Sequence, residues 1–263
     1  MASSDIPKPT TSAGQTPVRY MDTAAAYDQW AEVYDTDGNF LQALDTIEMK
    51  DLLPHFLQTI RQPKPWKLVD LGCGTGRNLL PLLHEPNARV IGLELSRKML
   101  GVARSRVEGF QEKMDGNRGA QAVELILYDM IEQPRPPELA IDADGLVSTL
   151  VLEHIPLEVF FKTASQILRE GGVFLVTNMH SEMGEKSQAG FVDPATGEKI
   201  RPKSYAHCVD DVVGAARSYG FQLEGDVLER RVDDLNLQAL GKRAEKWNGV
   251  LVWYGMIFRK TSG

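Results

Sequence analysis

The sequence predicts an α/β fold in which a doubly wound, mostly parallel sheet carries helices on both faces. Apolar runs of strand length alternate five times with amphipathic helical patterns between Trp66 and Asn178, which requires right-handed crossovers between parallel strands. The first run leads into a glycine-rich loop followed by a helical pattern, and such a loop brings backbone N–H groups close to a ligand. That loop reads Asp70-Leu71-Gly72-Cys73-Gly74-Thr75-Gly76.

Composition limits the function classes. The 263 residues are 43% hydrophobic and 25% charged, which is ordinary for a globular protein, and the net charge of −7 argues against a nucleic-acid partner. Two cysteines, Cys73 and Cys208, form neither a disulfide framework nor a zinc site by themselves. We see no secretory start and no apolar run of about 18 residues, so we expect a cytoplasmic protein without membrane contact.

The N-terminal region divides into a tail and a helical segment. Residues 1–17 are rich in Ser, Thr and Pro and predict a flexible tail, followed by one domain over residues 18–263. From Tyr20 to Leu57 the pattern is helical, with a second helix from Leu41 to Gln58. Tyr27, Trp30, Ala31 and Tyr34 share one helical face, which by itself is more typical of core packing than of a binding site.

The central elements follow in order. We expect strands at residues 66–71, 89–95, 123–128, 143–150 and 173–178. The intervening helices are expected at residues 77–84, 96–114 and 156–169, the last ending at Gly171-Gly172, with a loop at residues 115–119.

After Asn178 the alternation changes. Residues 184–204 are polar, and two extended runs around Pro194 to Gly197 predict a small hairpin or flap. A helix over 209–219, a strand over 221–232, a helix over 235–246 and a final strand over 249–259 complete the chain.

The glycine loop differs from the phosphate-binding loops. The spacing Gly72-x-Gly74-x-Gly76 lacks the deeper third glycine of G-x-G-x-x-G, and no Gly-Lys-Ser/Thr follows it. Asp70 adds a carboxylate that can orient an ammonium group through the loop. The sequence therefore predicts a ligand without phosphates.

Two acids at the ends of the following strands narrow the ligand further. Glu94 comes 18 residues after Gly76, where a carboxylate can accept both hydroxyls of a ribose. Asp129 ends the third strand and can accept the exocyclic amine of an adenine, while Met130 offers its backbone N–H to a ring nitrogen. Because the carboxyl ends of parallel strands share one edge, the three features together indicate adenosine.

Several segments resemble class I S-adenosylmethionine-dependent methyltransferases, and most closely their small-molecule branch of ubiquinone/menaquinone-type and natural-product enzymes. The resemblance rests on residues 69–78, 90–100, 125–130, 145–156 and 167–176, and extends to the leading helix at residues 27–35. It implies a Rossmann-like sheet of seven strands, mostly parallel, in which strand seven is antiparallel. It also implies an N-terminal helical lid at residues 20–58 and a substrate flap insertion at residues 181–207.

The resemblance further implies the cofactor and its contacts. The cofactor would be S-adenosyl-L-methionine, which leaves as S-adenosyl-L-homocysteine. The residues expected to bind it are Tyr20, Tyr27, Tyr34, Asp70, Gly72, Cys73, Gly74, Gly76, Asn78, Glu94, Leu95, Asp129, Met130, Ser148 and Leu150.

The acceptor side depends on three histidines near the active edge. His154 follows the fourth strand, His180 the fifth, and His207 the flap, and an imidazole suits the general base that a hydroxyl or ammonium acceptor needs. We expect O-methylation of a small hydrophobic or aromatic metabolite in secondary metabolism, with N-methylation next, by a monomer or homodimer. No metal is expected, because no residues show metal-ligand spacing.

Two other functions stay open at this point. A protein methyltransferase for histone-type Lys or Arg would want an acidic groove, which the charge of −7 permits. A pericyclase-like member would keep the cofactor loop without methylating and would need no base.

Overall fold

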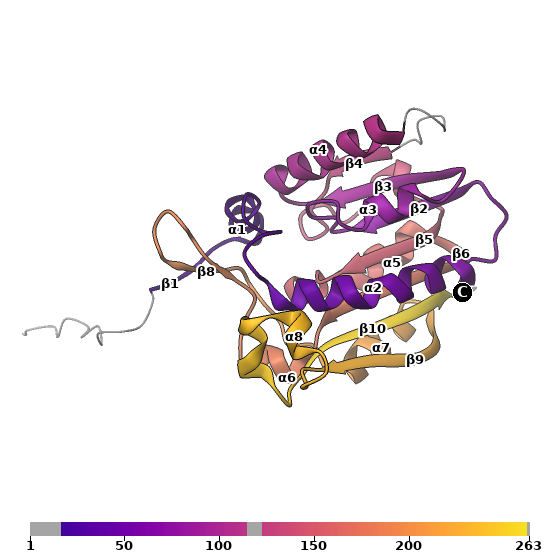
Figure 1. The fold of residues 1–263 in the computed structure, drawn as a ribbon. Coiled ribbons are helices and arrows are strands. Elements are labelled where there is room, and N and C mark those ends of the chain that lie inside the picture. The colour runs from indigo at the N-terminus through magenta and orange to yellow at the C-terminus, as the bar shows by residue number, and fades with distance from the viewer. Residues whose placement is uncertain (1–16, 115–122, 262–263) are drawn as a thin grey trace, which may run out of the picture.

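The computed structural model describes residues 17–114 and 123–261 (Figure 1). The predicted tail therefore falls outside the described residues except for Pro17, and so does the predicted loop at residues 115–119. None of the described helices is both long and apolar enough to cross a membrane.

A seven-stranded sheet forms the centre of the molecule, in the order β4-β3-β2-β5-β6-β10-β9. Within this sheet β10 alone runs in the opposite direction to the other strands, which confirms the predicted topology. The strands are β2 (Trp66–Leu71), β3 (Ala88–Glu94), β4 (Val123–Leu127), β5 (Ala143–Thr149), β6 (Leu168–Met179), β9 (Phe221–Arg231) and β10 (Leu251–Lys260).

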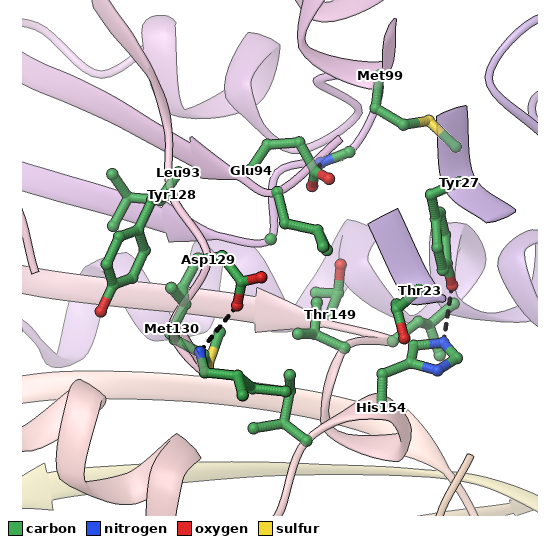
Figure 2. A pocket seen from close by; sticks show the side chains of 18 of the residues that line it. Thr23, Tyr27, Leu93, Glu94, Met99, Tyr128, Asp129, Met130, Thr149 and His154 are labelled. Carbon is green, nitrogen blue, oxygen red and sulfur yellow. Dashed lines mark hydrogen bonds between the residues drawn. The ribbon is translucent and has the colours of Figure 1, made fainter. Parts of the chain in front are cut away.

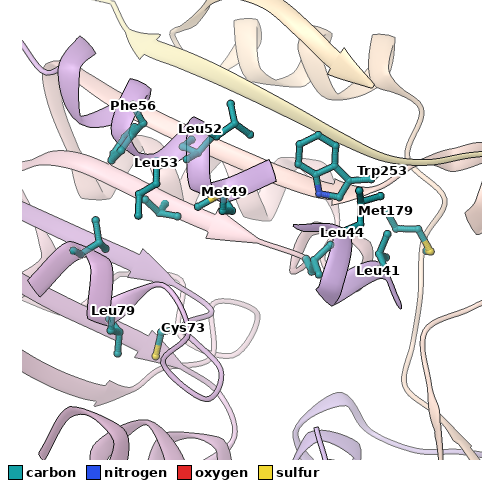
Figure 3. Packing of buried hydrophobic residues seen from close by; sticks show 14 of the residues in the cluster. Leu41, Leu44, Met49, Leu52, Leu53, Phe56, Cys73, Leu79, Met179 and Trp253 are labelled. Carbon is teal, nitrogen blue, oxygen red and sulfur yellow. The ribbon is translucent and has the colours of Figure 1, made fainter. Parts of the chain in front are cut away.

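Helices cover both faces of this sheet because neighbouring strand residues point to opposite sides. Leu68 of β2 packs with α2, α3 and α4 in one buried cluster, whereas the next residue, Val69, packs with α5 and α7 in another. Figure 3 shows the α2 side, where Leu53 and Phe56 lie over the strands. These helices are α2 (Phe40–Thr59), α3 (Leu79–Leu83), α4 (Arg97–Met114), α5 (Leu157–Ile167) and α7 (Val209–Ser218).

A second, small sheet joins the N-terminal segment to the flap. The predicted hairpin is confirmed as β7 (Phe191–Val192) and β8 (Lys199–Arg201), and β1 (Val18–Tyr20) pairs in parallel with β8. Helix α1 (Thr23–Trp30) packs on the hairpin, with the Trp30 ring stacked on that of Phe191 at 5.0 Å. The lid and flap regions are thus one connected structure (Figure 1).

Of the two predicted N-terminal helices, the first is wrong at both ends. Residues 18–20 form a strand because β8 supplies backbone partners that a sequence pattern does not reveal. Helix α1 ends at Trp30, and hydrogen-bonded turns such as Val33 N–H to the Trp30 carbonyl continue the chain. Tyr34 therefore lies beyond the helix, although its ring still meets those of Tyr27 and Trp30.

Two other boundaries also differ. Helix α5 ends at Ile167, and β6 starts at the next residue and continues through Gly171-Gly172. The strand can include Gly171, which has a left-handed backbone (φ 71°), because the pairing of β6 with β5 shifts register at this point. The predicted helix at residues 235–246 is split by Gly241 (φ 78°). Its two parts are α8 (Leu237–Leu240) and the 3-10 helix η3 (Lys242–Trp247). Three short elements were not predicted, namely η1 (Glu138–Ala140), η2 (Leu152–His154) and α6 (Ser181–Gly184).

Candidate functional site

A cavity lies at the carboxyl ends of β2 to β5, with α1 on its other side (Figure 2). Parallel strands place ligand sites at this edge, where strand order reverses between β2 and β5. Of the predicted residues, those that line it are Tyr27, Tyr34, Gly72, Gly74, Glu94, Leu95, Asp129, Met130, Leu150 and His154.

Glu94 links the glycine loop to the next strand. Its carboxylate is only 5% exposed and accepts hydrogen bonds from the backbone N–H groups of Gly74 (2.9 Å) and Ser96 (2.8 Å). Burial raises its pKa, and these backbone bonds act in the opposite direction. Gly74 has φ 54° and no atom within 4 Å of where a Cβ would stand, so the loop is open toward the cavity there.

Asp129 lies in the turn that follows β4. Its Oδ1 accepts hydrogen bonds from the N–H groups of Ile131 (2.8 Å) and Glu132 (3.3 Å), and the first is drawn in Figure 2. The turn holds both Asp129 and Met130 against the cavity. Glu94 and Asp129 therefore lie at neighbouring strand ends, as the sequence predicts.

His154 and Tyr27 form a hydrogen-bonded pair from opposite walls. His154 Nδ1 must donate to the Lys203 carbonyl (2.7 Å), so its Nε2 is unprotonated and accepts from the Tyr27 hydroxyl (2.8 Å; Figure 2). Burial lowers the pKa of His154 to about 4 and raises that of Tyr27 well above its ordinary value. Glu153 Oε1 lies 4.0 Å from the same Nε2, and burial raises the pKa of Glu153 to about 7.

Three predicted cofactor residues of the loop do not line the cavity. Asp70 is 1% exposed, and burial raises its pKa to about 7. Cys73 packs beneath β3, where a Cβ on Gly92 would stand 2.9 Å from its Sγ. Gly76 packs on α4, since a Cβ there would meet Ala103 at 3.2 Å. These residues shape the loop from behind.

Three others also do not line the cavity. Asn78 donates from Nδ2 to the Thr149 hydroxyl (2.8 Å), and the Ser148 hydroxyl donates to the Leu71 carbonyl (2.7 Å). Both therefore tie the loop to β5. Tyr20 lies in β1 and is 65% exposed.

The other two histidines have structural partners and do not line the cavity. His180 Nδ1 accepts from the Glu182 N–H (3.0 Å) at the start of α6, and its Nε2 donates to Glu229 (2.9 Å). His207 donates from Nε2 to the Ile155 carbonyl (2.9 Å) and stacks on Tyr205. Among the three predicted histidines, His154 alone lines the cavity.

Several residues that were not predicted from the sequence also line the cavity. Asp22 accepts from the N–H groups of Ala24 and Ala25 and so caps α1; an Asp followed by Thr-Ala-Ala is a start signal for a helix. Apolar contacts carry no comparable signal. The additional lining residues include Asp22, Thr23, Leu71, Leu93, Met99, Tyr128, Thr149, Val151 and Ile155.

A second cavity adjoins the first beneath the flap. Tyr27, Tyr34 and Leu150 line both cavities and form their common wall. Leu150 has φ 56°, a left-handed conformation that is costly for a branched residue and is found most often at functional sites. The remaining wall includes Trp30, Phe40, Gln188, Phe191, Lys199, Arg243, Lys246 and Trp247. No group of three or more His, Cys, Asp or Glu able to hold a metal occurs among the residues described.

Comparisons with known proteins identify the family and the fold. A methyltransferase domain family matches residues 69–176. The chain is 50% identical over 265 residues to the uncharacterized methyltransferase AN0656 of Emericella nidulans, with 91% of each chain covered.

Solved structures share the fold at low sequence identity. DhpI in complex with S-adenosylhomocysteine has a TM-score of 0.59 at 16% identity, covering 91% of this chain and 96% of its own. Magnesium protoporphyrin IX methyltransferase from Synechocystis, with S-adenosylhomocysteine bound, has a TM-score of 0.56 at 16% identity, covering 90% and 95%. The chain therefore belongs to the methyltransferase family, in the class I fold of the enzymes that use S-adenosylmethionine.

Proposed function

We propose that the protein transfers the methyl group of S-adenosylmethionine to a small hydrophobic or aromatic acceptor, at oxygen in the first instance and at nitrogen in the second. One observation carries the proposal: two adjoining cavities share the wall formed by Tyr27, Tyr34 and Leu150. Direct methyl transfer needs donor and acceptor on either side of one reacting carbon. The cavity at the strand ends would hold the donor, and the cavity beneath the flap the acceptor.

The residues of the first cavity fit an adenosine ligand. Glu94 would accept the two ribose hydroxyls while it keeps the loop closed through Gly74. Asp129 would accept the exocyclic amine of adenine, and the Met130 N–H would donate to the ring. Met99 and Tyr128 supply apolar walls.

The aromatic residues of the second cavity favour a flat or apolar acceptor. Trp30 stacks on Phe191 at 5.0 Å, and Phe40 stacks on Trp247 at 6.3 Å, so two aromatic pairs line it. An aromatic cavity beneath a hairpin suits a small molecule better than a protein side chain carried on a backbone. We therefore prefer a small acceptor to a histone-type one.

The hydrogen bond between Tyr27 and His154 lies at the common wall and suits removal of a proton. The sulfonium already activates the methyl carbon; an acceptor oxygen attacks it, and the carbon–sulfur bond breaks with its electron pair on sulfur. Methylation makes the acceptor O–H strongly acidic, so even an imidazole with a pKa of about 4 can take the proton late in the reaction. We assign this step to His154 Nε2, with the Tyr27 hydroxyl as the relay.

The test combines labelled donor with a metabolite panel. Purified protein is incubated with S-adenosylmethionine carrying an isotopically labelled methyl group, and products are identified by mass spectrometry. Label in phenolic or other small acceptors supports the proposal; label only in added histones, or none in any acceptor with intact S-adenosylhomocysteine binding, contradicts it. The second result would favour a non-methylating, pericyclase-like member.

A matched pair of variants tests the base. His154→Gln is expected to lower kcat by about 100-fold or more, while His207→Gln, which lies outside both cavities, is expected to keep kcat. An unchanged kcat in His154→Gln would leave positioning alone as the source of catalysis. Action in the cytoplasm, in secondary metabolism, and as a monomer or homodimer stays a prediction.

A further inference from the structure

We propose that the acceptor carries an anionic oxygen group, a carboxylate or a phosphate, which binds at the end of the second cavity away from the donor. The inference rests on the proposed function and narrows its substrate class. Three cationic side chains carry it, namely Lys199 of β8 and Arg243 and Lys246 of η3.

The charge of this cavity wall is of one sign. Lys199, Arg243 and Lys246 line it, and no Asp or Glu is among its lining residues in the described part of the chain. Lys199 is half-buried; burial and the positive charges of Arg201, Lys246 and Arg243 lower its pKa. Like charges gathered in a concave wall repel one another, so an anion bound among them relieves that repulsion.

The two lysines are available for a ligand. Within the described residues, neither Lys199 nor Lys246 has an ion pair; Lys246 lies only over the Trp247 ring, 5.0 Å from its centroid. Arg243 is partly satisfied, because it donates to the Asp37 carbonyl (2.7 Å) and lies 3.8 Å from the Asp37 carboxylate. The lysines therefore provide the main recognition.

The position of the three cations implies that the anionic group of the acceptor is not the atom that receives the methyl group. Lys199, Arg243 and Lys246 line only the second cavity, whereas Tyr27 and Leu150 form the wall shared with the donor. The anionic group is thus a handle that orients the acceptor, and a different atom receives the methyl group.

One more polar group points to the same occupant. The Gln188 side-chain oxygen is buried on this cavity and has no hydrogen-bond partner among the described residues. A buried acceptor oxygen left unpaired is costly, so a ligand hydroxyl or N–H that donates to it is favoured. An acceptor with an apolar body, a polar substituent and an acidic end satisfies the aromatic walls, Gln188 and the lysines together.

The test compares matched ligands on the protein loaded with S-adenosylhomocysteine. The probes are a hydroxynaphthoic acid, its carboxamide and a naphthyl phosphate, and titration is followed by calorimetry. We expect at least one anionic probe to bind about 10-fold more tightly than the carboxamide. The carboxylic acid and the phosphate distinguish the two anionic groups.

Variants locate the effect. In the double variant Lys199→Gln/Lys246→Gln the preference is expected to fall to about threefold or less, whereas Lys242→Gln, on the same 3-10 helix but outside the cavity, keeps it. S-adenosylhomocysteine affinity serves as the check that each variant is folded.

The outcomes separate this inference from the proposed function. Equal binding of acid, phosphate and carboxamide, no binding of any probe, or a preference that survives the double variant overturns the anionic acceptor. An anionic probe that binds in a lysine-dependent way while no methyl acceptor is found overturns the methyl-transfer proposal and leaves the anion site standing.

Discussion

Glu94 offers the sharpest test of the donor site. We expect Glu94→Gln to weaken S-adenosylhomocysteine binding by about 100-fold, because in the proposed arrangement the Glu94 carboxylate accepts both ribose hydroxyls. The substitution keeps the shape of the side chain and removes its charge and one acceptor oxygen.

The magnitude follows from the contacts of Glu94. A hydrogen bond to a charged group contributes about 1.5–3 kcal/mol, so losing one such bond and weakening the second costs about 3 kcal/mol. At about 1.4 kcal/mol for each tenfold change, that is roughly two orders of magnitude in Kd. In the wild type the Gly74 and Ser96 N–H groups donate to the Glu94 carboxylate at 2.9 and 2.8 Å. In Glu94→Gln the amide NH2 group replaces one of the two carboxylate oxygens, so one of these backbone N–H groups loses its acceptor. We expect the unfolding free energy to fall by about 1–3 kcal/mol.

The assay has to separate these two effects. Calorimetric titration gives Kd for S-adenosylhomocysteine, and urea unfolding without ligand gives stability. Glu124→Gln is the matched control: Glu124 lies on neighbouring β4, is about half-exposed, and sits 3.7 Å from Arg89 on the surface. A folded Glu94→Gln protein whose Kd stays within threefold of the wild type refutes the assignment of Glu94 to the ribose.

Three further predictions follow from glycine geometry and from burial. Gly72→Ala is expected to lose several kcal/mol of stability in urea unfolding, because its Cβ would stand 2.3 Å from Val151 Cγ2 at φ 76°. Gly74→Ala, with open space at the Cβ position, is expected to cost only about 1 kcal/mol in stability but to weaken S-adenosylhomocysteine binding, measured by calorimetry, since the methyl group enters the cavity; a variant that binds normally contradicts this. Burial raises the pKa of Glu153 from 4.5 to about 7, so the folded state keeps a proton that the unfolded state releases, and stability falls as pH rises through that window. We therefore compare the unfolding free energy of Glu153→Gln with that of the wild type, and expect the difference to favour the variant by up to about 3 kcal/mol more at pH 8 than at pH 4. A difference in urea unfolding that does not change with pH would show that Glu153 ionises freely.

The sequence predicted the sheet and the edge of the sheet where the first cavity lies, because the signals for both are local. A strand, an acid and three alternating glycines at residues 68–76 fix a tight loop whatever surrounds it, and Glu94 and Asp129 end strands whose order follows from right-handed crossovers. How deeply each side chain is buried, in contrast, depends on elements that are distant in the sequence. Cys73 and Gly76 belong to the same motif yet pack on β3 and α4, and Asp70 is buried, because elements that come later in the chain cover these residues.

The acceptor side was predicted less well because it depends on packing between distant segments. His180 and His207 stand near the active edge in sequence order, but Glu229, 49 residues after His180, and the carbonyl of Ile155 use their ring nitrogens. The pairing of β1 with β8 also has no signature in the strand Val18–Tyr20 itself. Lys199 and Lys246 meet at one cavity only because the hairpin and η3 fold toward the same place.

Charge at the common wall connects the geometry with methyl transfer. Burial lowers the pKa of His154 to about 4 and raises the pKa values of Tyr27 and Tyr34, so all three are neutral at pH 7. A sulfonium donor brings a positive charge to this wall, and transfer of its methyl group turns it into a neutral thioether. A wall with a fixed carboxylate would stabilise the charged reactant more than the transition state and so slow the reaction. The neutral Tyr27, Tyr34 and His154 side chains avoid that loss. Glu153 lies 4.0 Å from His154 Nε2, and burial, which raises the pKa of Glu153 to about 7, favours its uncharged form as well. The ratio of Kd values for S-adenosylmethionine and S-adenosylhomocysteine measures this balance. A neutral wall gives the sulfonium no counter-charge for its lost hydration, so we expect S-adenosylmethionine to bind no more tightly than S-adenosylhomocysteine, and clearly tighter binding of S-adenosylmethionine would contradict this account.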